Sequence, residues 1–125
     1  MSVHVEVDVT SGVPVYEQVR AQVVAHVAAG RLSPGDRLPT IRALATDLGL
    51  APGTVARAYR ELEQAGVVAT RRRTGTVVAD DAAGGQDSAA HSAARRAATA
   101  YVTAARAAGL TTDEALDLVR GALLT

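Results

Sequence analysis

Residues 38–66 contain two short amphipathic segments that meet at a glycine-centred turn, and this arrangement constrains the fold more than any other part of the chain. Thr40 has the side-chain oxygen expected of a helix N-cap, and Gly49 suits the left-handed conformation that ends a helix. Between them, apolar residues recur at the spacing of one helix face: Ile41, Leu44, Ala45 and Leu48. The pattern predicts a short helix followed by a tight turn.

The second segment is predicted to be a helix that starts at Pro52, since the N–H that proline lacks would have no partner in a first turn. Its apolar face is formed by Val55, Ala58, Tyr59 and Leu62. Its opposite face carries Gly53, Thr54, Arg57, Arg60, Glu61 and Gln64. Two helices around such a turn are typical of a helix-turn-helix, whose second helix enters a DNA groove. An ordinary helical hairpin with a solvated polar face fits these two segments equally well.

A basic hairpin follows and favours the first interpretation. Residues 67–70 and 76–79 are predicted to be strands, and residues 71–75 the turn between them. Arg71, Arg72 and Arg73 repel one another at this tip. Binding to a nucleic acid would offset this repulsion, because each neutralised phosphate releases condensed counterions. Arginine also suits a narrow minor groove. We therefore expect an α+β, mainly α, winged helix-turn-helix, and a solvated charge run is the weaker alternative.

Several motifs along the same stretch agree in order and spacing with a known family. They are P-V-Y-E-Q-V at 14–19, G-R-L-S-P-G-D-R-L-P-T at 30–40, R-A-L-A at 42–45, T-V-A-R-A-Y-R-E-L-E at 54–63, G-V-V at 66–68 and G-T-V-V at 75–78. Over residues 12–79 the chain resembles the DNA-binding domain of the GntR family of bacterial transcription regulators. The resemblance implies a winged helix with three helices, the first over residues 14–30.

The resemblance also implies which residues contact DNA. The arginine of the L-P-x-x-R motif falls on Arg42, the recognition-helix contacts on Pro52, Gly53, Thr54 and Ala56, and the wing contacts on residues 71–74. Pro52 and Ala56 stand where family members commonly carry arginine or asparagine, so base specificity is not carried over. Together with residue chemistry, these considerations predict the following DNA-binding set: Thr40, Arg42, Pro52, Gly53, Thr54, Arg57, Arg71, Arg72, Arg73, Thr74 and Gly75.

Charge is distributed in keeping with this prediction. The chain has no formal net charge and no lysine, but residues 34–79 hold seven arginines and four acids, a balance of +3. Residues 80–125 hold four arginines and six acids, a balance of −2. The positive surface is therefore expected over the proposed helix-turn-helix and wing. Because lysine is absent, arginine must make all contacts between basic side chains and phosphates.

Residues 80–125 are predicted to be a linker and a two-helix dimerisation region, separate from a domain of residues 1–79. Residues 80–94 read as a linker or a frayed helix start, and a helix is expected over 92–108, ended by Gly109. Thr111 and Glu114 form a capping-box pattern before a last helix.

Two such helices are too few to enclose an effector cavity. They resemble the tail of the YtrA-type branch of the GntR family, which implies a homodimer; packing on the chain's own winged domain is the alternative. The predicted dimerisation residues are Ala98, Tyr101, Ala105, Leu116, Val119 and Leu123.

The first residues form a separate pattern. Val3, Val5, Val7 and Val9 alternate with polar residues, which predicts a half-buried strand. Its partner could be the wing or a neighbouring subunit.

Other functional classes find little support. Cysteine is absent, which excludes disulfides, thiolate metal sites and cysteine catalysis. The three histidines are scattered, and no nucleophile elbow or phosphate-binding loop occurs. No long apolar run or signal peptide is evident, so a cytoplasmic protein is expected. We predict no enzyme activity, no metal and no cofactor, and no effector is indicated. The predicted function is a dimeric repressor that binds a pseudo-palindromic operator; the alternative is a winged-helix protein-interaction module that does not bind operator DNA.

Overall fold

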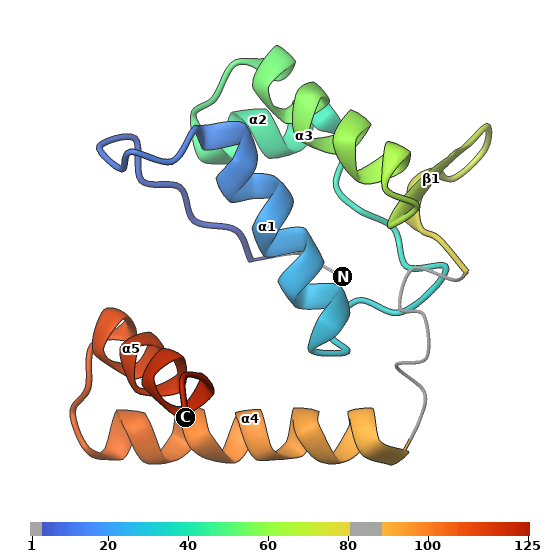
Figure 1. The fold of residues 1–125 in the computed structure, drawn as a ribbon. Helices are drawn as coiled ribbons and strands as arrows, with labels where there is room; N and C mark the ends of the chain where they lie inside the picture. The colour runs from blue at the N-terminus through green and yellow to red at the C-terminus, as the bar shows by residue number, and fades with distance from the viewer. Residues whose placement is uncertain (1–3, 81–88) are drawn as a thin grey trace. The chain divides into compact units, whose positions relative to one another are not determined.

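The computed structural model describes residues 4–80 and 89–125. It divides the chain into two compact units, residues 1–86 and 87–125. The described residues of the first unit form three helices and a hairpin, and those of the second form two helices (Figure 1). The predicted class, a mainly helical winged helix-turn-helix followed by two C-terminal helices, is confirmed.

The first unit is built around α1 (Val15–Ala28), which buries Val19, Val23 and Val27. α3 (Pro52–Gln64) packs against α1, and α2 (Ile41–Leu48) packs against α3. The wing consists of β1 (Val68–Arg71) and β2 (Gly75–Val78). The core contains aliphatic residues and a single tyrosine, and its most buried members are Val19, Val23, Val55, Leu62 and Val78.

The ends of α2 and the start of α3 form as the local chemistry predicts. The Thr40 hydroxyl accepts a hydrogen bond from the Ala43 N–H at 3.0 Å and caps α2. Gly49 ends the helix with a left-handed φ of 68°, which a residue with a Cβ adopts only at a cost. Pro52 opens α3 after Ala51, which makes no side-chain cap. The helix-turn-helix is therefore specified largely within its own sequence.

The wing hairpin starts one residue later than predicted. Val68 pairs with Val78 and Arg71 with Gly75, so that only residues 72–74 lie beyond the ladder. A third segment, which the sequence did not reveal, completes its base. Gly35 N–H donates to the Val78 carbonyl oxygen at 2.9 Å, and Leu38 N–H donates to that of Thr76 at 2.9 Å. The loop between α1 and α2 thereby fixes the wing to the domain.

The prediction of an N-terminal strand was wrong. Residues 4–8 form no ladder with any other described segment, and they are held instead by glutamines of α1. Gln18 accepts from the Asp8 N–H at 2.8 Å and donates to the Asp8 carbonyl oxygen at 2.9 Å. Gln22 accepts from the Glu6 N–H at 2.9 Å and donates to the carbonyl oxygen of that residue. A side-chain amide carries the same donor and acceptor as a peptide group, so it can replace a neighbouring strand.

The alternation behind that prediction survives in part. Val5 is buried, Val7 is half-buried and Val9 is exposed, while Val3 lies outside the described residues. The apolar side of the segment therefore faces the core of its own domain.

The second unit is a helical hairpin formed by α4 (Ala89–Ala107) and α5 (Thr112–Leu123). Gly109 turns the chain with a φ of 78°. The predicted capping box is present, because Glu114 N–H donates to the Thr111 hydroxyl oxygen at 3.1 Å and Thr111 N–H to the Glu114 carboxylate at 2.9 Å. The Tyr101 hydroxyl donates to the Ala115 carbonyl oxygen at 2.6 Å and joins the two helices.

α4 begins before the predicted position 92, and the rest of the predicted linker lies largely outside the described residues. In the described ranges, no helix has the length and apolar character needed to cross a membrane.

Candidate nucleic-acid interface

The predicted recognition helix, α3, has one buried and one exposed face. Val55, Ala58 and Leu62 are completely buried, and Tyr59 nearly so. Pro52 and Gly53, at the start of the helix, are exposed, whereas Thr54 and Ala56 are half-buried. The predicted contacts of the first turn are therefore accessible, and three of these four residues carry no side-chain hydrogen-bond donor.

The start of α2 is connected to α3 by a buried hydrogen bond. The Tyr59 hydroxyl donates to the carbonyl oxygen of Pro39 at 2.7 Å. Burial raises the pKa of Tyr59, so its hydroxyl remains a neutral donor. Pro39 precedes the cap residue Thr40, and Arg42 follows in the first turn of α2. The Arg42 side chain is exposed and makes no hydrogen bond or ion pair with any described residue.

Arg57, predicted to reach DNA, is already engaged by other residues. Its guanidinium carbon lies 3.8 Å from the centroid of the Tyr16 ring on α1. The same guanidinium donates to the Tyr16 hydroxyl at 3.2 Å and, one turn along α3, to Glu61 at 3.3 Å. This arrangement combines a cation–π contact with an i,i+4 ion pair. Sequence reasoning missed Tyr16, because a contact across 41 positions leaves no local signal.

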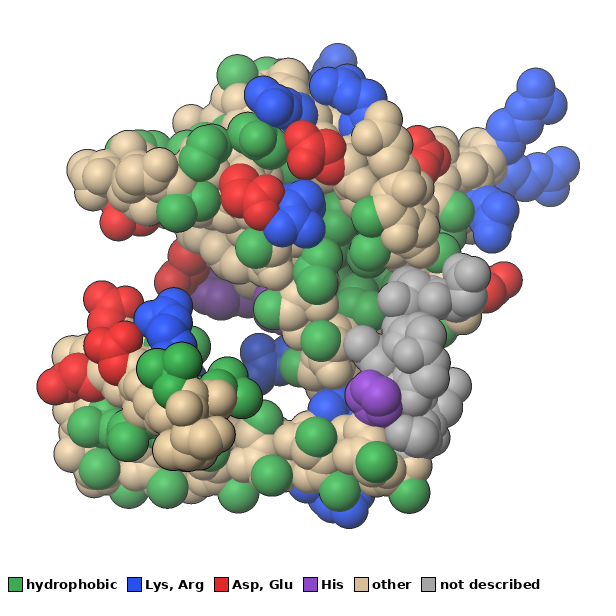
Figure 2. Space-filling view, viewed as in Figure 1, with side chains coloured by type: hydrophobic (Ala, Val, Ile, Leu, Met, Phe, Trp, Pro, Cys, Tyr) green, Lys and Arg blue, Asp and Glu red, His purple; other side chains and the backbone are tan. Residues whose placement is uncertain are grey.

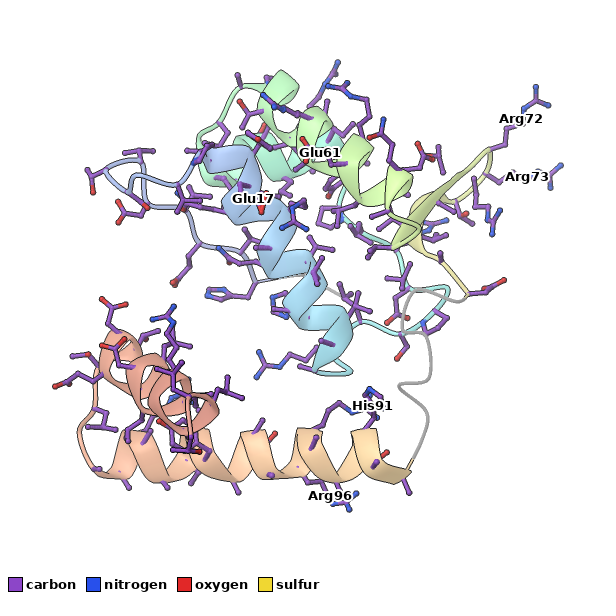
Figure 3. All side chains as sticks on the ribbon, in the orientation of Figure 1. Glu17, Glu61, Arg72, Arg73, His91 and Arg96 are labelled. Carbon is purple, nitrogen blue, oxygen red and sulfur yellow. The ribbon has the colours of Figure 1, made fainter. Side chains whose placement is uncertain are left out.

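A second polar contact stabilises the adjoining surface of α1. Arg20 Nε donates to the two carboxylate oxygens of Glu17 at 3.0 and 2.8 Å. This hydrogen bonding lowers the pKa of Glu17, and Arg20 also interacts electrostatically with Glu61. Glu17 on α1 and Glu61 on α3 are labelled in Figure 3. Both acids of this surface therefore face arginines that belong to the scaffold.

Arg60 is the α3 cation that the predicted DNA-binding set omitted. Its side chain is exposed, and within residues 4–80 and 89–125 it has no hydrogen-bond or ion-pair partner. The spacing of the apolar residues had placed it on the polar face, and that was the available signal.

The wing presents the most concentrated positive charge. Arg71, Arg72 and Arg73 are exposed, and the two at the tip point away from the domain in Figure 3. Figure 2 shows these blue side chains projecting from the hairpin. The hairpin is held to α3 by Glu63, whose carboxylate accepts from the Thr70 N–H at 3.2 Å. Thr74 is also exposed, and Gly75 closes the turn with a φ of 76°.

Comparison with known proteins decides what this surface belongs to. The model of the gntR family of bacterial regulatory proteins matches residues 15–78, more than half of the chain. The chain belongs to the GntR family. It is therefore a DNA-binding transcriptional regulator rather than an enzyme, as the sequence predicted.

Individual GntR relatives extend the likeness beyond the winged domain. The HTH-type transcriptional regulator Rv1152 of Mycobacterium tuberculosis is 48% identical over 110 residues, covering 88% of this chain and 86% of that protein. The HTH-type transcriptional repressor YtrA of Bacillus subtilis is 42% identical over 72 residues, covering 58% and 55%. The structure of YtrA from Sulfolobus acidocaldarius, a GntR-family transcription factor, has a TM-score of 0.57 at 37% identity, covering 62% of this chain and 81% of that one. These relatives place the chain with the YtrA-type GntR regulators.

The tail of this GntR regulator carries an apolar groove between α4 and α5. Of the predicted dimerisation residues, Ala105 is buried inside the hairpin and Tyr101 is half-buried. Leu116 is 46% exposed, Val119 40% and Leu123 78%. Except for Leu123, the predicted set lines the groove, together with Val102 and Leu110: Ala98, Tyr101, Ala105, Leu116 and Val119.

Proposed function

We propose that this GntR regulator is a dimeric repressor of a pseudo-palindromic operator, with α3 in the major groove and the wing in the minor groove. One observation carries the proposal. The acids of α3 are engaged by the scaffold, Glu61 by Arg57 and Glu63 by the wing backbone, whereas Arg42 and the wing arginines have no acidic partner among the described residues. Such a surface lowers its free energy by binding phosphates.

Three parts of the domain divide the work of binding. Thr40 and Arg42, at the N-terminal end of α2, bind the phosphate backbone, where the helix dipole also favours an anion. The small residues Pro52 and Gly53 allow α3 to approach the bases closely. Thr54 donates from its hydroxyl to a phosphate or contacts a thymine methyl with its own methyl group. Residues 71–75 enter the minor groove, where arginine is favoured by the negative potential. Arg57 contributes by holding α3 to α1.

Dimerisation supplies the second recognition helix, which binds the second half-site. The exposed apolar side chains of α5 and the groove beside α4 would be covered by the same surface of a second copy. A two-fold dimer then presents two recognition helices to half-sites about one turn of DNA apart. Repression is proposed because the relative YtrA of Bacillus subtilis is a repressor.

Salt dependence of operator binding tests the proposal. An operator is first selected from random DNA, and its affinity is then measured by fluorescence anisotropy at increasing salt. We expect the affinity to fall steeply, and a variant with alanine at 71, 72 and 73 to flatten the slope of log K against log salt by about 2–3, since each neutralised phosphate contributes about 0.9.

Arg31→Ala is the matched control, because Arg31 follows the C-terminal end of α1, at the opposite end of the domain from the α2–α3 turn in Figure 1. It should leave the slope unchanged. Absence of DNA binding at every salt concentration would overturn the proposal and favour the alternative, a winged-helix protein-interaction module.

A further inference from the structure

The two arginines of α3 differ in what already contacts them. Arg57 stacks on the Tyr16 ring at 3.8 Å and donates to the Tyr16 hydroxyl and to Glu61. Moving it toward DNA would break all three contacts and expose the Tyr16 face. Arg60, three residues later, makes no such contact with the described residues, so it can move toward DNA without breaking any.

Helix geometry places Arg60 over the part of α3 that faces outward. It follows Ala56 by one turn and Gly53 by two, so the three residues share a face. Side chains of a helix lean toward its N-terminus, and a long side chain therefore covers the turn before its own Cα. The methyl group of Ala56 leaves that space open, so the Arg60 guanidinium can extend along the helix toward its exposed start.

Three neighbours of Arg60 near the start of α3 cannot hydrogen-bond to bases through their side chains. Pro52, Gly53 and Ala56 carry no side-chain donor or acceptor, and Thr54 is half-buried. Their small size instead brings the helix close to the groove floor. The exposed face of α3 thus combines close approach at its first two turns with a long, planar donor group that has no other partner among the described residues, the Arg60 guanidinium.

We propose that Arg60 is the specificity-determining residue of the recognition helix and that it donates two parallel hydrogen bonds to a guanine in each half-site. The guanidinium fork matches the O6 and N7 acceptors of guanine in the major groove. Arg57 is a positioning residue that fixes the orientation of α3 through Tyr16. This inference rests on the proposed operator binding and adds to it the base that is read and the residue that reads it.

Binding-site selection with variant proteins tests the assignment. Arg60→Ala should weaken binding to the selected operator about 5- to 150-fold and remove the preference at one base pair in each half-site. Arg60→Lys should keep the salt dependence but weaken that preference, because an ammonium group keeps the charge and can donate to guanine but lacks the planar fork. Both variants should melt within about 2 °C of the wild type, since an exposed, unpartnered side chain contributes little to stability.

Two further variants separate reading from positioning. Arg57→Ala should lower the melting temperature and weaken binding to all sequences, with the base preferences unchanged. Gln64→Ala, one turn beyond Arg60 on an exposed position, should match the wild type in every measurement.

Unaltered affinity and base preference in Arg60→Ala would overturn the inference. So would an equal loss of affinity for all sequences with a salt slope lower by about one, which identifies a phosphate contact. Either result requires wild-type protein that binds its selected operator. A wild type that binds no DNA contradicts the proposed function itself, and the two failures are thereby distinguished.

Discussion

The hydroxyl of Tyr59 on α3 donates to the carbonyl oxygen of Pro39, immediately before the residue that caps α2. This one buried hydrogen bond joins the recognition helix to the first turn of α2, which carries Arg42. The two segments proposed to contact DNA are consequently oriented through the core rather than through the surface. Tyr59 is also the only aromatic residue among the buried residues of the described chain.

Replacing this hydroxyl should destabilise the domain. Tyr59→Phe keeps the ring in the core but leaves the Pro39 carbonyl oxygen without its donor, and we expect the free energy of unfolding to fall by about 1–2 kcal/mol. Urea denaturation followed by circular dichroism measures the change. Tyr16→Phe is the matched control, because that hydroxyl only accepts a hydrogen bond from the exposed Arg57, and it should cost clearly less. Equal losses in the two variants would contradict this account.

The glutamines of α1 lead to a prediction about the N-terminal segment. Changing both Gln18 and Gln22 to alanine removes the side-chain amides that pair with the backbone of Asp8 and Glu6. Amide hydrogen exchange at these two residues should accelerate, while exchange in α1 stays the same. Gln22→Glu should give an intermediate result, since a carboxylate still accepts from the Glu6 N–H but no longer donates. Unchanged exchange in the double variant would show that other contacts hold the segment, such as the burial of Val5 and the hydrogen bond between the His26 ring and the His4 carbonyl oxygen.

These features also show how far local sequence determines this fold. The Thr40 cap, the Gly49 end and the Thr111–Glu114 box were predicted because donor and acceptor lie within a few residues of each other. The wing was predicted with the correct pairing but with strands that stop one residue short of the turn, because Arg71 and Gly75 also pair. The N-terminal segment has the alternation of a strand, but its polar partners come from a helix. Alternation reports burial of one face and says nothing about the partner.

Some residues of the candidate site could likewise be predicted from local sequence, and others only from the fold. The wing arginines and Arg42 stand out in the sequence because charge runs and motif positions are local features. The contact between Arg57 and Tyr16 joins two helices far apart in the chain, and only the fold reveals it. That contact in turn draws attention to Arg60, which the polar-face pattern contained but did not distinguish. Packing is what separates two arginines of equal chemistry.

The capping box of α5 makes the stability of the tail depend on pH. Hydrogen bonds from the Thr111 backbone and side chain lower the pKa of Glu114 below its usual value. The ionised carboxylate is therefore favoured in the folded state, and its stabilisation is complete above the pKa of the unfolded chain, about 4.3. The contribution is lost as the pH falls through the lower folded-state pKa.

Comparison with Glu114→Gln at several pH values measures this contribution. Near pH 6 the wild type should be more stable than the variant by thermal unfolding. The difference should shrink as the pH falls from about 5 toward 3, because the protonated carboxyl and the amide are similar acceptors. A difference that stays constant over this range would show that the carboxylate charge plays no part. Asp117→Asn serves as a control: Asp117 pairs only with Arg120 on the exposed surface, so its difference from the wild type should be small at every pH.

The apolar face of the tail leads to a prediction about dimerisation, on which recognition of the full operator depends. Leu116 and Val119 line the groove and remain about half exposed in a single chain, so changing both to arginine would place charge in the proposed dimer interface. Analytical ultracentrifugation should show a dimer for the wild type and a monomer for this variant. Ala100→Arg is the control, because position 100 lies on the side of α4 opposite Ala98, and it should remain dimeric.

The monomeric variant should still bind a half-site through its intact winged domain. Its affinity for the full operator should be much lower, because the second half-site no longer binds at the effective concentration that a dimer provides. A variant that remains a dimer would place the interface elsewhere on the chain.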